Sequence, residues 1–158
     1  MAEQLNIPRE IRIIESLFDP FQLQKEYQAS SLKERTDYGA MVSFIGNMRD
    51  FNEGDIVSSM ELEHYPAMTQ KKLDKIVDQA SEQWAIQNVF IVHRVGKIFP
   101  GEPIMMVAVW SAHRAAAFDA CRFLMEELKH RAPFWKKEQL VSGDSRWVDK
   151  NTDGYSKP

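Results

Sequence analysis

The run Ile104-Met-Met-Val-Ala-Val-Trp110, followed directly by Ser111-Ala-His-Arg114, decides the fold of this chain. Its uninterrupted apolar character predicts a central strand that is buried in a sheet. Ser111 is a favourable N-cap, so a helix is predicted from Ala112 to about Lys129, before Pro133 stops it. The core stripe of this helix is predicted to consist of Phe118, Cys121, Leu124, Met125 and Leu128.

The rest of the chain alternates between strand and helix patterns. Further strands are predicted at residues 11–14, 40–45, 60–65 and 89–95, with short ones at 134–140 and 146–148. Helices are predicted from the turn at Asp19-Pro20 to about Gln28, and from Pro66 to Trp84. Because the order strand–strand–helix occurs at 38–84 and again at 88–130, we expect an α+β fold with a largely antiparallel sheet, packed helices and these units in tandem.

Composition limits the classes of function. The chain has 158 residues, 44% of them hydrophobic, and a net charge of −3, which is typical of one globular domain and does not favour nucleic acid or an anionic membrane. No apolar run approaches the ~20 residues of a membrane span, and the N-terminus lacks signal-peptide features. One cysteine excludes an internal disulfide or a CxxC site. We therefore expect a cytoplasmic protein, with any anion site formed by a local concentration of basic residues.

His113 and Arg114 are the first candidates for such a site. They occupy the expected first helical turn, where unpaired N–H groups already carry partial positive charge and acidic residues are normally favoured. An anion bound at this helix N-terminus would explain the two bases. The alternative is a solvated helix start, with Arg114 paired to Asp119 or to a more distant acid.

A second basic group surrounds Pro133-Phe134-Trp135 and begins with Lys129, which lies on the flank of the predicted apolar stripe. A lysine there can lay its stem on apolar surface and present its amine to a pocket as a nucleophile or base. The alternative is that Lys129, His130 and Arg131 only complement the C-terminal helix dipole.

Beyond this helix, strand alternation predicts that Lys136 shares a face with Phe134, whereas Lys137 shares the other face with Trp135. An aromatic ring beside a cation suits a phosphorylated heterocycle; the alternative is an edge strand protected by lysines.

Gly46-Asn47-Met48-Arg49 ends a predicted strand and enters a loop, where binding groups accumulate. Arginine suits bidentate phosphate contacts, although a surface ion pair of Arg49 with Asp50 or Asp55 is an equal alternative. Cys121 is interpreted as a packed small hydrophobe rather than a nucleophile. The four histidines do not show the spacing of metal ligands, so no metal site is predicted.

Several motifs in one order resemble the catalytic (large) subunit family of molybdopterin synthase. They are Gly46-Asn-Met-Arg49, Leu62-Glu-His-Tyr-Pro-Ala-Met68, His93-Arg-Val-Gly96, Ser111-Ala-His-Arg114 and Leu128-Lys-His-Arg-Ala-Pro-Phe-Trp-Lys136. The resemblance covers about residues 38 to 149 and implies an α/β-hammerhead-like fold. It divides a single domain into residues 1–37, an N-terminal strand, helix and connection, residues 38–149, the catalytic α+β domain, and residues 150–158, a polar tail.

The function that this resemblance implies is sulfur transfer to cyclic pyranopterin monophosphate, giving the dithiolene of molybdopterin. Large subunits of the family pair as a central homodimer within a heterotetramer. Each binds a small ubiquitin-like sulfur-carrier subunit whose C-terminal Gly-Gly thiocarboxylate enters the active site, and no further cofactor is implied.

The motif positions of the family also imply the site residues. The catalytic lysines fall on Lys129 and Lys136. The substrate-binding residues fall on Asn47, Met48, Arg49, His113, Arg114, Lys137 and Glu138. Asn47 stands where some relatives carry lysine, which reduces the positive charge of the loop. Two other classes remain open from the residues alone: a non-catalytic module that binds a phosphorylated nucleotide, pterin or acidic tail, and an RNA-binding domain, which the negative net charge disfavours.

Overall fold

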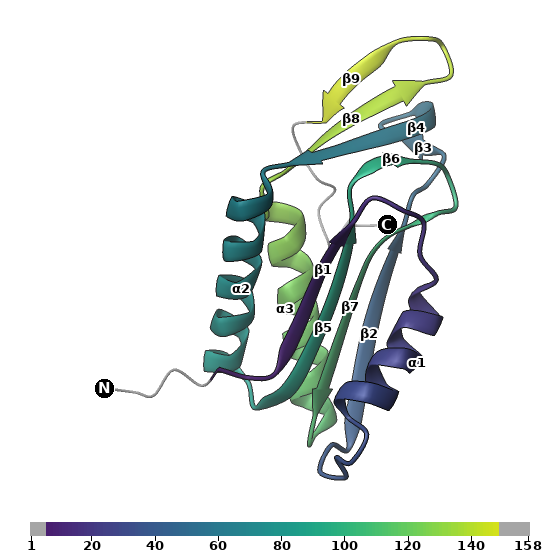
Figure 1. Ribbon diagram of the computed structural model, residues 1–158. Coiled ribbons are helices and arrows are strands. Elements are labelled where there is room, and N and C mark those ends of the chain that lie inside the picture. The colour runs from purple at the N-terminus through teal and green to yellow at the C-terminus, as the bar shows by residue number, and fades with distance from the viewer. Residues whose placement is uncertain (1–5, 149–158) are drawn as a thin grey trace.

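The computed structural model describes residues 6–148, which form two sheets and three helices (Figure 1). The strands of the first sheet are β1 (Arg9–Ile14), β2 (Ala40–Asn47), β5 (Ile86–Arg94) and β7 (Pro103–Ser111). The second sheet contains β3 (Phe51–Asn52), β4 (Asp55–His64), β6 (Gly96–Ile98), β8 (Phe134–Leu140) and β9 (Ser145–Val148). The helices are α1 (Pro20–Ser31), α2 (Pro66–Gln83) and α3 (Arg114–His130).

The first sheet has the strand order β1-β5-β7-β2. β1 runs parallel to β5, whereas the β5–β7 and β2–β7 pairs are antiparallel. The two central strands are almost completely buried, with Met106 to Trp110 at 0% exposure. Their long apolar runs follow from this position, because a strand covered on both faces has no solvent side to carry polar residues.

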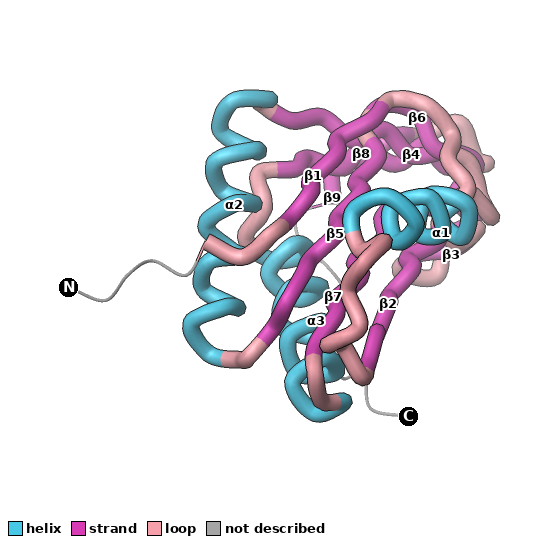
Figure 2. Tube along the Cα trace, turned by 60° about the horizontal axis from the view of Figure 1, so that its bottom comes forward, coloured by secondary structure: helices cyan, strands magenta, loops and turns pink. Residues whose placement is uncertain are grey.

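Helices cover both faces of this sheet (Figures 1 and 2). α2 and α3 pack on one face over a core that includes Leu73, Val77 and Leu124. α1 packs on the other face, where Tyr27 stacks on Phe90 at 4.3 Å between ring centroids. Since β1 and α1 contribute to these two cores, the N-terminal segment is built into the same body as the rest.

The second sheet lies across one end of the first (Figure 1) and has the order β3-β4-β8-β9. β6 pairs with residues 60–62 of β4, which also pair with β8, so β6 and β8 lie on opposite edges of β4. A separate small core holds it, formed by Met48, Val57, Met60, Leu62 and Ile98. The sharp β3–β4 turn uses Glu53 and Gly54, both with positive φ, so that the chain reverses over two residues. The two sheets therefore meet where β2 and β5 end and β7 begins.

Every helix and strand predicted from the sequence is present, with boundaries shifted by a few residues. β3 and β6 were not predicted. The two strand–strand–helix units differ in structure. In the first unit, β2 and β4 belong to different sheets; in the second, β5 and β7 pair with each other. The coarse α+β prediction is confirmed. The predicted tail at residues 150–158 lies outside the described residues.

Two details of the α3 prediction are wrong. Phe118 is 61% exposed and Met125 only half-buried; the buried stripe is instead Ala117, Ala120, Cys121, Leu124 and Leu128. The N-cap is His113 rather than Ser111, whose hydroxyl donates to the Ala85 carbonyl. The helix therefore starts two residues later than predicted, and a different set of residues faces the core. Cys121 is packed in the core as predicted, and burial raises the pKa of its thiol to about 11.

The turn between β7 and α3 depends on a close approach of two backbones. A Cβ added at Gly39 would lie 2.5 Å from the Ala112 carbonyl oxygen, and the Gly39 N–H donates to the Ser111 carbonyl at 3.0 Å. Only glycine fits here without displacing the turn that carries His113. Within residues 6–148, no helix has the length and apolar character needed to cross a membrane.

Candidate active site

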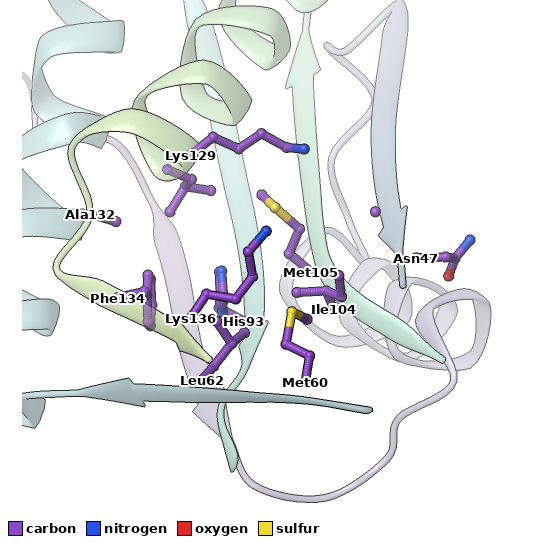
Figure 3. A pocket seen from close by; sticks show the side chains of 12 residues that line it. Asn47, Met60, Leu62, His93, Ile104, Met105, Lys129, Ala132, Phe134 and Lys136 are labelled. Carbon is purple, nitrogen blue, oxygen red and sulfur yellow. The ribbon is translucent and has the colours of Figure 1, made fainter. Parts of the chain in front are cut away.

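A hollow lies where the two sheets meet the C-terminal end of α3 (Figure 3). Its apolar lining comes from Met60, Leu62, Ile104, Met105, Leu128 and Phe134. Its polar side chains are Asn47, His93, Lys129 and Lys136. The lining therefore comes from the ends of β2 and β5, from β4, from the start of β7, from the end of α3 and from β8. This is a mostly apolar pocket with a few convergent polar groups, the usual composition of a small-molecule site.

Lys129 and Lys136 enter this hollow from two different elements (Figure 3). Lys129 is in the last turn of α3, and Lys136 is on β8 on the same face as Phe134, as the alternation predicted. Burial lowers the pKa of Lys136, and Lys129 and Arg49 lower it further, whereas Glu138 raises it. The two lysines therefore act on each other electrostatically, and the hollow concentrates positive charge in an apolar setting.

A second, more polar hollow adjoins the first and shares both lysines with it. Met48 and Arg49, at the end of the β2 segment, line it together with Asn52 and Glu138. The Arg49 guanidinium lies 4.9 Å from the centre of the exposed Phe51 ring. Asn47 stands at the edge of the first hollow with its amide pointing away from the lysines (Figure 3). Of the predicted loop residues, Arg49 thus adds positive charge beside the lysine pair.

Glu138 is 4% exposed and is held by neighbouring side chains. Asn52 donates to both of its carboxylate oxygens at 3.1 Å, and the Arg146 Nε donates to one of them at 3.1 Å. Arg146 also donates to Asp55 at 2.8 Å. Glu138 therefore links β3, β8 and β9 through hydrogen bonds. Both of its carboxylate oxygens accept from neighbouring protein donors.

Three predicted site residues lie elsewhere in the same chain. Lys137 is exposed on the opposite face of β8, with its ammonium 5.5 Å from the centre of the Trp147 ring. His113 and Arg114 are exposed at the beginning of α3. Lys129 is fifteen residues further along the helix than Arg114, which corresponds to about 22 Å. The expectation that both basic clusters of this helix converge on one pocket is therefore not met within a single chain.

The structure adds His93, which the sequence analysis did not select as a site residue, and pairs it with Phe134. Their rings are stacked 3.9 Å apart at 10°, and both line the hollow beside Lys136. His93 is 5% exposed, and desolvation lowers its pKa to about 4. The available signal was a histidine at the end of an otherwise apolar strand run, which local pattern could not distinguish from a packed core histidine.

A third, wider hollow opens on the other side of the lysines. Its lining includes Tyr65, Trp135 and Trp147, which are all exposed, together with Lys129 and Lys136. The Tyr65 and Trp135 rings meet edge to face with centroids 5.0 Å apart. The two amines are therefore accessible from a polar side and from an aromatic side.

The fold and this site define an α+β protein with a cationic, partly apolar pocket suited to a strongly anionic ligand. Residues 17–131 match the family described as MoaE protein. The chain is 49% identical over 139 residues to the molybdopterin synthase catalytic subunit of Pseudomonas aeruginosa, covering 88% of this chain and 89% of that relative. It is 48% identical over 130 residues to that of Escherichia coli, covering 82% and 85%.

Solved structures agree with these relatives. A molybdopterin biosynthesis MoaE protein from Burkholderia ambifaria has a TM-score of 0.73 at 44% identity, covering 92% of this chain and 93% of that one. A molybdopterin synthase from Staphylococcus aureus has a TM-score of 0.75 at 30% identity, covering 87% and 95%. The chain belongs to the MoaE protein family of molybdopterin synthase catalytic subunits. It is an enzyme of molybdenum cofactor biosynthesis that converts cyclic pyranopterin monophosphate to molybdopterin, which excludes the non-catalytic alternative.

Proposed function

We propose that the chain carries out this conversion by sulfur transfer, with the sulfur supplied as the C-terminal thiocarboxylate of a small ubiquitin-like partner. The proposal rests on one observation: Lys129, from α3, and Lys136, from β8, line the same hollow. The phosphorylated pterin and the thiocarboxylate are both anions. Two ammonium groups and a nearby guanidinium offset the repulsion between them when they share one pocket.

The roles of these cations follow from their positions. We assign Lys129 to the thiocarboxylate, where it assists attack or proton transfer. Lys136 and Arg49 bind phosphate and stabilise the charge that develops as the cyclic phosphate opens. The lowered pKa of Lys136 is consistent with a desolvated amine, and such an amine binds an anion more strongly than one in water.

The sulfur has to come from outside the chain. Cys121 is the only cysteine in the sequence; it is buried in the core, where its raised pKa suppresses the thiolate. A partner tail can reach the lysines from the side lined by Tyr65, Trp135 and Trp147, while the pterin occupies the side that carries Arg49. The solved Helicobacter pylori relative is a complex of subunits 1 and 2 of molybdopterin-converting factor. We propose an equivalent complex here.

His113 and Arg114 act in this scheme only if a second copy of the chain is present. We propose that they contribute to the pocket of the other large subunit in a central homodimer, because about 22 Å separates Arg114 from Lys129 of its own chain. Both residues are exposed at the start of α3, which leaves them available to a neighbour. Phe118, one turn further along and 61% exposed, is an apolar contact for the same interface.

The remaining assignments that the resemblance implies stay proposals. Lys137, on the outer face of β8, has a route to substrate only through a neighbouring chain or the partner tail. Asn47 and Met48 position the loop that carries Arg49, and Glu138 holds β8 in register beneath Lys136. A cytoplasmic location, a hammerhead-like arrangement of the sheets and a catalytic region at residues 38–149 are likewise inferred from the sequence.

The direct test is reconstitution. The purified chain is mixed with a thiocarboxylated ubiquitin-like donor and cyclic pyranopterin monophosphate, and dithiolene formation is assayed. The same donor with an ordinary carboxylate terminus is the matched control. Product from both donors, or from neither, would contradict the sulfur-transfer proposal.

A further inference from the structure

His93 lies in the hollow but has no part in the roles assigned above. It is the penultimate residue of β5, is 5% exposed, and stands beside Lys136 (Figure 3). One face of its ring is covered by Phe134 at 3.9 Å. The position of the ring is therefore set by the strand below it and by the stacked phenyl group beside it.

The hydrogen bonding of the ring determines which nitrogen carries the proton. Nδ1 lies 2.9 Å from the backbone carbonyl oxygen of Arg94. A carbonyl oxygen only accepts hydrogen bonds, so Nδ1 carries the proton and Nε2 has a free lone pair in the neutral ring. Nδ1 therefore makes the hydrogen bond that fixes the ring. Nε2 is on the edge of the ring furthest from the backbone, and the His93 side chain lines the hollow.

The surroundings keep this imidazole neutral. Desolvation is the main cause of its low pKa, about 4; the hydrogen bond to the Arg94 backbone opposes this shift, and His64 on β4 lowers the pKa further. The other titratable groups on the hollow are Lys129 and Lys136, which also disfavour a third positive charge. At physiological pH the ring is therefore a permanent acceptor and a poor proton carrier. It supplies a fixed lone pair to a hollow whose two ammonium groups can only donate hydrogen bonds.

A ligand that fills the hollow excludes water from it, so the Nε2 acceptor then needs a donor on that ligand, because buried polar groups are nearly always hydrogen-bonded. We infer that His93 is a positioning residue whose Nε2 accepts a hydrogen bond from an N–H group of the reactant bound beside Lys129 and Lys136. This rests on the proposed function. Both reactants offer such donors: the ring and amino N–H groups of the pterin, and the backbone amides of the Gly-Gly tail.

Three substitutions separate the contributions of the ring. His93→Phe keeps the stacking on Phe134 but removes both nitrogens. His93→Asn retains a polar atom near Nδ1, and His93→Gln carries its amide oxygen close to the position of Nε2. For each variant we would measure the melting temperature, the Kd of cyclic pyranopterin monophosphate by calorimetry, and kcat and KM for pterin and thiocarboxylated donor separately.

We expect His93→Phe and His93→Asn to weaken binding of one reactant about tenfold, the equivalent of one hydrogen bond, and His93→Gln to restore most of it. A change in the Kd of the pterin identifies the heterocycle as the donor, whereas a change confined to the KM of the protein donor identifies the tail amide. Wild-type constants in all three variants would overturn the inference. Equal losses of binding in all three variants, accompanied by lower melting temperatures, would also overturn it. A fall in kcat with unchanged Kd and KM would do the same. A wild-type chain that binds pterin but forms no dithiolene would instead count against the proposed function.

Discussion

Arg114 and Lys129 occupy the first and last turns of the same helix, α3, and the rigid helix keeps them about 22 Å apart. The two basic clusters that the sequence analysis assigned to one site therefore lie at opposite ends of α3. If both bind the same substrate, the pocket is shared between two copies.

This geometry predicts complementation between two inactive variants. Arg114→Ala and Lys129→Ala homodimers should each be nearly inactive, yet their mixture should recover activity after subunit exchange. Random pairing makes half of the dimers mixed, and each mixed dimer contains one intact pocket, so about one quarter of the wild-type activity is expected. Additive residual activities after mixing would show instead that each pocket uses its own chain.

Lys129→Ala alone should abolish product formation, because it removes the amine assigned to the thiocarboxylate. Its side chain lies on the hollow rather than in the main core, so folding and partner binding should be retained. Turnover is measured with the thiocarboxylated donor, and the complex by gel filtration. Lys71→Ala, an exposed lysine on α2, is the matched control and should leave both unchanged. Near-normal turnover by Lys129→Ala would refute the assignment.

Lys136→Met should raise stability while it removes activity. Burial lowers the pKa of Lys136 in the folded chain, so the unfolded chain holds this proton more tightly and the charged amine destabilises the fold at neutral pH. An apolar side chain of similar length should gain about 1 kcal/mol in urea unfolding at pH 7. The destabilisation is relieved as pH rises from the lowered pKa toward 10.5, so the advantage of methionine should shrink there. An unchanged or lower stability at pH 7 would contradict this account of the lysine.

Arg146→Ala should destabilise the second sheet. The guanidinium donates to Glu138, to Asp55 and to the backbone carbonyl of Asn52. Without it, the buried Glu138 carboxylate loses a charged donor and keeps the side-chain amide of Asn52. Loss of a charged hydrogen bond to a buried group costs about 2 kcal/mol, measurable by urea denaturation. The matched control is Arg131→Ala, whose exposed ion pair with Glu127 should contribute less than about 1 kcal/mol. Equal effects would mean that the cluster has no special role.

His93 should make stability depend on pH. Its pKa is about 4 in the folded chain against an ordinary 6.5, so the unfolded chain binds more protons between these values. Stability is therefore lost as pH falls through this window, by about 2 kcal/mol between pH 7.5 and pH 5. His93→Phe should lack this contribution, and the difference between the two urea-unfolding profiles measures it. Parallel profiles would mean that the imidazole is not buried in its neutral form.

The elements of the fold were largely readable from local pattern. The continuous apolar run of β7, the period-two alternation of β4 and the helical stripe of α2 each reflect burial within one element. β3 and β6 escaped because strands of two or three residues are too short to show a period. Phe118 was placed in the core by its type alone, although its angle around α3 turns it to solvent.

By itself, the sequence determined the family to which these motifs belong, and it predicted the candidate site residues, a basic loop end at Arg49 and the lysines around Phe134. Only the tertiary structure decided which of them meet. β2 and β4, joined by the short segment that contains β3, belong to different sheets. Arg49, Lys129 and Lys136 line one hollow where these sheets meet, whereas Arg114 lies at the other end of α3. The tertiary structure also places His93 on the wall of the hollow. Strand pairing and the stacking of His93 on Phe134 are long-range contacts, which no local period in the sequence encodes.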